Sequence, residues 1–239
     1  MKHYTIIPLA VGFNETDQGV MTYLHSYGKR ILLPIYVFAI QGADRKIIVD
    51  TGLEDFMTPP DLEDRLGFPV MHFEEALESI GWTPEGVDIV IHTHLHNDHC
   101  ENDNLCSNAE VYVQKAELDF LRDPHPVDHR YYPDILDDVN VLAIEGDATI
   151  VEGIHVLFTP GHTLGGQSVA VETSAGKAVI TGLCCNGENF TSSGGVIAPG
   201  VHLNLIQAYE SMKRIREVAD IIIPLHDIEV GRKKIIPIS

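Results

Sequence analysis

The stretch IHTHLHNDHC, residues 91–100, concentrates side chains that can bind metal ions, namely His94, His96, Asp98 and His99. Such a run adds little to a hydrophobic core, because imidazole is polar and a carboxylate is costly to bury without a partner. Imidazole nitrogen and carboxylate oxygen are, in contrast, ligands that zinc, iron and manganese ions accept. We therefore interpret the stretch as metal-binding; the alternative is a solvated polar turn.

The spacing of these residues indicates where each side chain points. His94 and His96 are separated by one residue, so in an extended segment both imidazoles project from the same side. Asp98 and His99 follow where the strand should give way to a loop. We expect two ligands directed at one point and two at a second point nearby. His92 shares the parity but lies inside the strand, where we favour a packed, hydrogen-bonded histidine.

Two further histidines follow apolar strands elsewhere in the chain. His162 lies in the glycine-rich turn FTPGHTLGGQS, and His226 comes directly after IIIPL. Either histidine alone is weak evidence, because a lone histidine is more often structural. Together they complete two sets of three ligands. Two such sets predict two metal ions, each with open positions for water and substrate. The predicted sets are His94, His96 and His162, and Asp98, His99 and His226.

The elements that must position these residues are short apolar strands alternating with a few helices, which is typical of a layered α/β protein. We expect one compact domain spanning residues 1–239, because no linker or low-complexity segment interrupts the chain. In the last predicted helix, Leu203, Ile206, Met212, Ile215 and Ala219 recur at helical intervals. The predicted elements are a hairpin of 31–40 with 45–52, strands 87–94 and 220–225, and helices 72–82 (ending at Gly81), 114–121 and 203–219.

Composition limits the partners that we expect. The net charge of −19 argues against a nucleic acid or an anionic membrane surface, and no apolar run reaches membrane-spanning length. The N-terminus does not have the pattern of a signal peptide. The four cysteines are too few and too oddly placed for a disulfide framework, so we expect a cytoplasmic protein. They are Cys100, Cys106, Cys184 and Cys185.

Four motifs, THLHNDH, DTG at 50–52, TPGHTLGGQS and PLHD, resemble in this order the metallo-β-lactamase superfamily. The resemblance covers nearly the whole chain and is greatest to the branch of quorum-quenching N-acyl-homoserine lactonases and pyridoxolactonases. It implies an α/β fold, a four-layer αβ/βα sandwich with the metal site at one edge. It also implies two divalent ions, Zn²⁺ first with Fe or Mn as alternatives, a small-molecule substrate and a possible homodimer. Asp50 would orient a ligand histidine.

The chain departs from the family pattern at one ligand position. The superfamily usually supplies an Asp that bridges both metals, and the corresponding residue in AVITGLCCNGENF is Leu183. Cys184 follows, and its thiolate is a good zinc ligand, so a shift of one residue could restore coordination. The alternative is that Cys184 and Cys185 are small buried apolar residues.

A second departure concerns the substrate. The lactonases carry a Tyr shortly after the bridging Asp, and here Asn186 or Gly187 stands in its place. Tyr131, in the loop 122–134, and His202, at the start of the long helix, are the predicted substrate contacts.

The resemblance implies hydrolysis of a lactone by a metal-bound hydroxide, with Asp98 as the catalytic residue that passes a proton to the leaving group. Thioesters, as in glyoxalase II, and lactams or cyclic imides fit the same machinery. A di-iron redox or oxygen-binding protein is a further alternative, although its relatives usually have Glu where this chain has His96. A site that binds metal without turnover is a third alternative, motivated by Leu183.

Overall fold

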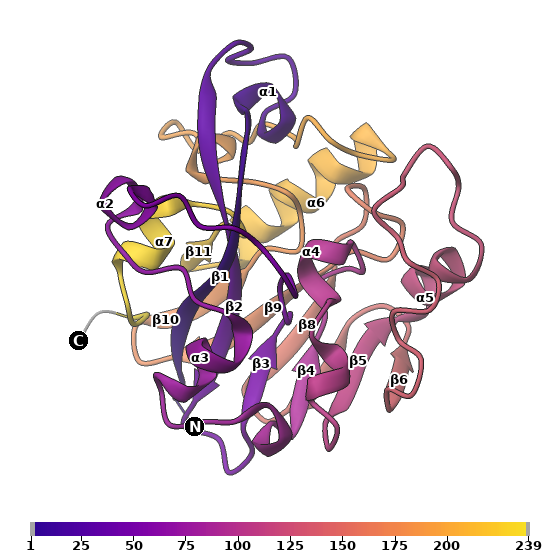
Figure 1. Ribbon diagram of the computed structural model, residues 1–239. Helices are drawn as coiled ribbons and strands as arrows, with labels where there is room; N and C mark the ends of the chain where they lie inside the picture. The colour runs from indigo at the N-terminus through magenta and orange to yellow at the C-terminus, as the bar shows by residue number, and fades with distance from the viewer. Residues whose placement is uncertain (1–2, 238–239) are drawn as a thin grey trace.

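The computed structural model describes residues 3–237, in which two β-sheets face each other and helices cover their outer sides (Figure 1). The first sheet has six strands in the order of the sequence, antiparallel up to β3 and parallel from β3 onward. They are β1 (Thr5–Asp17), β2 (Arg30–Gln41), β3 (Ile47–Val49), β4 (Ile89–Ile91), β5 (Glu110–Gln114) and β6 (Val141–Ile144).

The second sheet has five strands in the order β11-β10-β9-β8-β7, with only the pair β10 and β11 parallel. They are β7 (Ala148–Val151), β8 (Ile154–Phe158), β9 (Gln167–Thr173), β10 (Gly176–Ile180) and β11 (Ile221–Ile223). The helices are α1 (Gln18–Met21), α2 (Leu62–Leu66), α3 (Phe73–Glu78), α4 (Asn97–Cys100), α5 (Lys115–Arg122), α6 (Leu205–Val218) and α7 (Ile228–Arg232), with 3₁₀ turns η1 (Pro84–Gly86), η2 (Asp103–Leu105) and η3 (Gly187–Asn189).

Strand β2 shows how the sequence specifies the layers. Its side chains alternate between two cores, with Tyr36 and Phe38 in the core between the sheets and Ile35 and Val37 in the core under the outer helices. Because both faces are buried, the strand is a continuous apolar run rather than an alternating one. The predicted hairpin with the following strand is confirmed as the antiparallel pair of β2 and β3.

The outer layers are helical on both sides. Helix α3 packs on the first sheet through Phe73 and Leu77, whereas α6 packs on the second sheet through Met212 and Ile215. The order of layers is therefore helix, sheet, sheet, helix, which confirms the predicted four-layer αβ/βα sandwich. None of the described helices combines the length and apolarity that a membrane span requires.

The metal-binding motifs leave the sheets at one edge. Val49 of β3 pairs in parallel with Ile91 of β4, so Asp50 and the histidine-rich loop begin side by side. On the second sheet, Ile180 of β10 pairs in parallel with Ile223 of β11. The two edges meet at Gln167, which donates its backbone N–H to the Thr93 carbonyl at 2.9 Å and its side chain to the His92 carbonyl at 2.7 Å.

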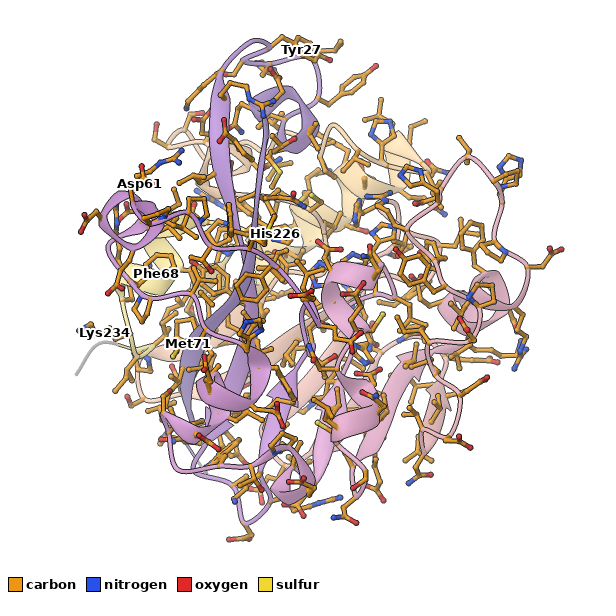
Figure 2. The ribbon with its side chains drawn as sticks, in the orientation of Figure 1. Tyr27, Asp61, Phe68, Met71, His226 and Lys234 are labelled. Carbon is orange, nitrogen blue, oxygen red and sulfur yellow. The ribbon has the colours of Figure 1, made fainter. Side chains whose placement is uncertain are left out.

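Strands β1 and β2 form a long antiparallel hairpin that was not among the predicted elements. Both strands run on past the sheet edge, and their connection carries α1 at the end of the hairpin that projects in Figure 1. Tyr27 lies at this far end in Figure 2, and its side chain is 66% exposed.

Two predicted elements are shorter in the structure than the sequence indicated. The regular part of α3 ends at Glu78, and Gly81 closes the helix end as predicted: it takes a positive φ of 74°, its N–H donates to the Glu78 carbonyl at 2.9 Å, and the Trp82 N–H donates to the Leu77 carbonyl at 3.0 Å. Strand 87–94 is reduced to β4, because the backbone leaves the sheet at His92 to form the loop.

The predicted apolar face of the last helix was wrong at Ile206. Helix α6 begins at Leu205, and its buried side is formed by Ala208, Ser211, Met212 and Ile215, which leaves Ile206 75% exposed.

Candidate metal centre

Both predicted ligand sets are brought together in the structure. In each set, one potential ligand atom per residue lies within 4.8 Å of the others. His226 comes from the segment after β11 and lies in the middle of the molecule in Figure 2, beside the loop after β4. The two sets are His94, His96 and His162, and Asp98, His99 and His226.

His94 has one engaged and one unengaged ring nitrogen. Its Nδ1 donates to the Thr93 hydroxyl at 3.0 Å, and that hydroxyl donates onward to Asp50 at 2.8 Å. Its Nε2 is buried and has no hydrogen-bond partner in the described part of the chain. A buried polar atom without a partner is unfavourable unless something else binds it. A cation held by Nε2 would satisfy this atom.

The other two imidazoles of the first set are also oriented through one nitrogen. Nε2 of His96 donates to the Asp128 carboxylate at 3.0 Å, and Nδ1 of His162 donates to the Val201 carbonyl at 2.8 Å. The other ring nitrogen, Nδ1 in His96 and Nε2 in His162, keeps a lone pair that can bind a metal ion. Such hydrogen bonds fix both the tautomer and the ring direction of metal-ligating histidines.

The second set follows the same arrangement. His99 Nδ1 donates to Asp50 at 2.9 Å, and His226 Nδ1 donates to the Pro34 carbonyl at 2.9 Å. The remaining His99 Nε2 lies 3.5 Å from the Asp98 carboxylate. Asp50 thus contacts His99 in the way that its predicted orienting role requires.

Asp50 is fully buried and adopts a positive φ of 60°, which is unusual for a residue with a side chain. Its carboxylate accepts the Thr93 backbone N–H at 2.7 Å in addition to the bonds described above. Burial alone would raise its pKa, but the charges of His99 and His92 outweigh burial and hold the pKa at about 2. Asp50 is therefore an anion that joins the loop after β3 to both ligand sets.

His92 is the packed histidine that the sequence predicted. It is buried, and its Nε2 bonds to Asp103 at 2.7 Å. Burial would lower its pKa, but Asp103, with a smaller effect of Asp50, raises the pKa to about 10. His92 points away from the ligand sets and counters the charge of the carboxylates behind them.

The protonation states suit cation binding. Burial, together with the charge of nearby His99, lowers the pKa of His94, and the same two causes lower the pKa of His226 to about 4. Burial also lowers the pKa of His162 and His96. These imidazoles are neutral at physiological pH, which is the form that binds a metal.

The residues at the expected bridging position point in different directions. Leu183 and Cys185 pack in the core beneath α6, and the Cys185 thiol lies 3.1 Å from the Thr181 hydroxyl. Cys184 instead lines the cavity at the metal centre, with its Sγ 3.7 Å from Met21 Sδ. Burial raises the pKa of the Cys184 thiol. Of these three residues, Cys184 is therefore the one that faces the cavity.

The cavity has a volume of about 310 Å³ and opens between the hairpin and the metal-bearing loops. Its walls combine the ligand sets with polar hairpin residues and a few apolar side chains. The walls include Asn14, Thr16, Val20, Leu33, Leu53, Asn97, Arg130, Cys184 and Val201, as well as the six candidate ligands.

The two predicted substrate contacts lie outside these walls. Tyr131 is 4% exposed, and its hydroxyl donates to Glu117 at 2.5 Å while its ring packs edge-on against His96. His202 bonds to the Pro199 carbonyl at 2.9 Å and packs edge-on against Tyr23. The structure gives Tyr131 a supporting position behind His96 and does not bring His202 into the cavity.

Sequence reasoning missed Glu117, which is fully buried in α5. Its carboxylate accepts the backbone N–H groups of Leu95 at 3.0 Å and Gly165 at 2.8 Å. It thereby ties the histidine-rich loop to the turn that bears His162. A glutamate in a short charged helix has no sequence signal that separates it from surface residues.

Asp128 and Arg130 were also missed. Both belong to a loop rich in proline and charge, for which solvent exposure is the ordinary expectation. The structure instead buries Asp128 against His96 and places Arg130 in the cavity wall. Their spacing in the sequence, with one residue between them, was the one available hint of a paired role.

Comparison with known proteins agrees with this geometry. The family model of the metallo-beta-lactamase superfamily matches residues 30–182. An N-acyl homoserine lactonase of Bacillus sp is 30% identical over 223 residues, covering 86% of each chain, and that of Bacillus cereus is 29% identical over 84% of each. A solved N-acyl homoserine lactone hydrolase has the product N-hexanoyl-L-homoserine bound at its catalytic metal centre. It is similar to this chain with a TM-score of 0.75 and 25% sequence identity, and the match covers 97% of this chain and 96% of that one. The chain belongs to the metallo-β-lactamase superfamily.

Proposed function

We propose that residues 1–239 form one metal-dependent hydrolase domain that opens a lactone or a related cyclic carbonyl compound. The observation that carries the proposal is the pair of three-residue ligand sets at the floor of one cavity. The N-acyl homoserine lactonases that resemble this chain over most of its length support a cyclic ester as the substrate class. The four free cysteines suit a reducing compartment such as the cytoplasm.

The histidine nitrogens and the carboxylate oxygen present fit two divalent ions. We propose two Zn²⁺ ions, with Fe or Mn as alternatives. Three donors on each side leave positions open for water and substrate, as in catalytic zinc sites. Bound ions would lower the pKa of a water to near neutrality and polarise the scissile carbonyl. The first set would be held by His94, His96 and His162, and the second by Asp98, His99 and His226.

Asp98 is the residue that we propose to move a proton during the reaction. Its carboxylate lies in the cavity wall, and its side chain is 21% exposed, so it can reach a bound substrate. Burial would raise its pKa, but His99 outweighs burial and lowers it, so Asp98 begins as an anion. An anion can accept a proton from the attacking water and deliver it to the alkoxide that leaves.

Cys184 is the proposed additional ligand, because it is the residue near the bridging position whose side chain reaches the cavity. Burial raises the pKa of its thiol, so ligation requires the thiol to release its proton to the solvent. The Cys184→Ala variant should lose metal occupancy, whereas Cys185→Ala, which alters the core under α6, should keep it. In cobalt-substituted protein, a thiolate charge-transfer band that disappears in Cys184→Ala would support ligation, and its absence in the unmodified chain would refute it.

A substrate panel on metal-loaded protein tests the function as a whole. The panel contains N-acyl homoserine lactones, simple lactones, lactams, cyclic imides and thioesters, with Asp98→Asn as the control. We expect turnover of lactones that depends on added Zn²⁺, Mn²⁺ or Fe²⁺. Turnover of thioesters alone would favour a glyoxalase-II-like enzyme, and no turnover by a fully metallated protein would favour a binding or redox role.

A further inference from the structure

Arg130 is the one described residue of the cavity wall whose side chain carries a permanent positive charge. Its backbone carbonyl accepts the Asn97 N–H at 2.9 Å, which fixes the loop after α5 against α4. The chain as a whole has a net charge of −19, so a cation beside a centre for two dications is not a consequence of composition. Its placement requires a specific explanation.

The guanidinium of Arg130 is held from one side only. Its Nε and Nη2 donate to the two oxygens of Asp128, both at 2.7 Å, and Asp128 also accepts from His96. This side-on pair uses two of the five N–H donors of a guanidinium. No hydrogen bond from Nη1 is found within residues 3–237. The remaining donors of Nη1 and Nη2 form a second fork, whose spacing matches a second carboxylate.

Arg130 lines the same cavity as the candidate ligands, His162 among them. Asp128, which is only 4% exposed, pairs with Arg130 through its carboxylate and offsets its positive charge. Glu15 and Asp98 also line the cavity, so an anionic group of a ligand would be favoured beside Arg130 rather than along the whole wall.

We propose that Arg130 is a specificity-determining residue that binds a carboxylate of the substrate, so that the preferred lactones are those carrying a carboxylate substituent. This inference rests on the proposed lactone hydrolysis. A fork of two charge-assisted hydrogen bonds distinguishes a carboxylate from a neutral group of the same shape by about tenfold to a hundredfold.

The test uses a γ-butyrolactone with a carboxylate on its γ-carbon and the corresponding neutral primary amide. With the metal-loaded full chain, kcat/KM for the acid should exceed that for the amide by about tenfold or more. Arg130→Gln should reduce this preference, so that kcat/KM falls more for the acid than for the amide, chiefly through a higher KM for the acid. Arg130→Lys should restore part of the preference, because it keeps the charge and loses the fork. The matched control is Arg122→Gln, at the end of α5, whose side chain is 73% exposed and pairs with Asp119 outside the cavity wall.

The outcomes separate the alternatives. Equal loss for acid and amide in Arg130→Gln, at unchanged metal content, would overturn the proposal and indicate that Arg130 acts on the reacting ester instead. A change confined to product inhibition would also overturn it and assign the fork to the carboxylate that hydrolysis creates. If the unmodified chain opens neutral lactones but discriminates against the acid, this inference fails alone, whereas failure to open any lactone refutes the proposed function.

Discussion

The two ligand sets differ in how their charge is arranged. The first consists of three histidines, and burial lowers the pKa of each, so it is neutral before any cation binds. The second contains the Asp98 carboxylate, and burial of His99 is outweighed by Asp98 and Asp50, which raise the pKa of His99. The first set is therefore ready for a cation, whereas the second must first give up a proton held between carboxylates.

The residues that hold the two ligand sets in place also differ. Glu117 fixes the backbone on both sides of the first set through Leu95 and Gly165. The second set depends on Asp50, a buried anion in a strained backbone conformation that accepts a hydrogen bond from His99. We expect the first site to bind its ion more tightly and the second to determine how the activity responds to conditions.

Removing a ligand of the first set should have the largest effect. His94→Ala removes the nitrogen that has no other partner, so the first ion and the polarisation that it supplies should be lost together. A fall in kcat/KM of at least about a thousandfold follows, because such an ion contributes several kcal/mol to the transition state. Metal content should fall by about one ion per chain in elemental analysis.

The control for this variant is His202→Ala, which changes a histidine outside the cavity wall. It should keep its metal and its turnover. Full activity of a His94→Ala protein that retains both ions would show that the first set is not the metal site.

Asp98→Asn should have the next largest effect. The amide oxygen can still serve as a weak ligand, but an amide cannot carry a proton to the leaving group. We expect kcat to fall by about a hundredfold to ten-thousandfold, with metal content reduced less than in His94→Ala. The diagnostic measurement is a lactone series with leaving alcohols of increasing acidity, because the loss should diminish as the alkoxide needs less protonation. A uniform loss across the series would assign Asp98 to metal binding alone.

The contrast between the two sets also explains what the sequence could and could not predict. His94, His96, Asp98 and His99 form a dense motif, and His162 and His226 each follow a strand, so local spacing and strand order sufficed. The layered α/β class was predictable from short apolar strands such as β2, whereas the four-layer αβ/βα arrangement was implied by the resemblance to the metallo-β-lactamase superfamily.

The supports could not be predicted, because they depend on distant contacts. Glu117 and Asp128 are buried by segments far away in the chain, and an isolated acidic residue gives no sign of that burial. Cys184 and Cys185 are neighbours with the same side chain, and only the direction of the chain after β10 decides which one faces the cavity.

Glu117→Gln tests how the first ligand set is held in place, and its expected effect is smaller than that of Asp98→Asn. The substitution keeps the shape and weakens bonds to two backbone N–H groups and a tyrosine hydroxyl, so the free energy of unfolding should fall by about 2–4 kcal/mol. Denaturant unfolding measures it, and metal affinity at the first set should fall more than at the second. Glu110→Gln, which breaks a half-exposed pair with Arg45, is the control and should cost less than about 1 kcal/mol. Equal costs would mean that Glu117 is not a support.

The smallest expected effect is a change in metal stoichiometry with pH. Because the pKa of His99 is raised, a proton competes with the second ion at pH values where His94 and His162, with lowered pKa, are already neutral. Lowering the pH should therefore empty the second set first, so that occupancy falls from two ions to one before it falls to none. Binding of the second ion should release a proton near neutral pH, and binding of the first should not. Calorimetric titration with Zn²⁺ in two buffers of different ionisation enthalpy measures that proton directly.

Asp50→Asn should lower the pKa of His99 by removing one of the carboxylates that raise it, and so shift the loss of the second ion to lower pH. Simultaneous loss of both ions on acidification would show that the two sets act as one site and that their difference in charge has no consequence.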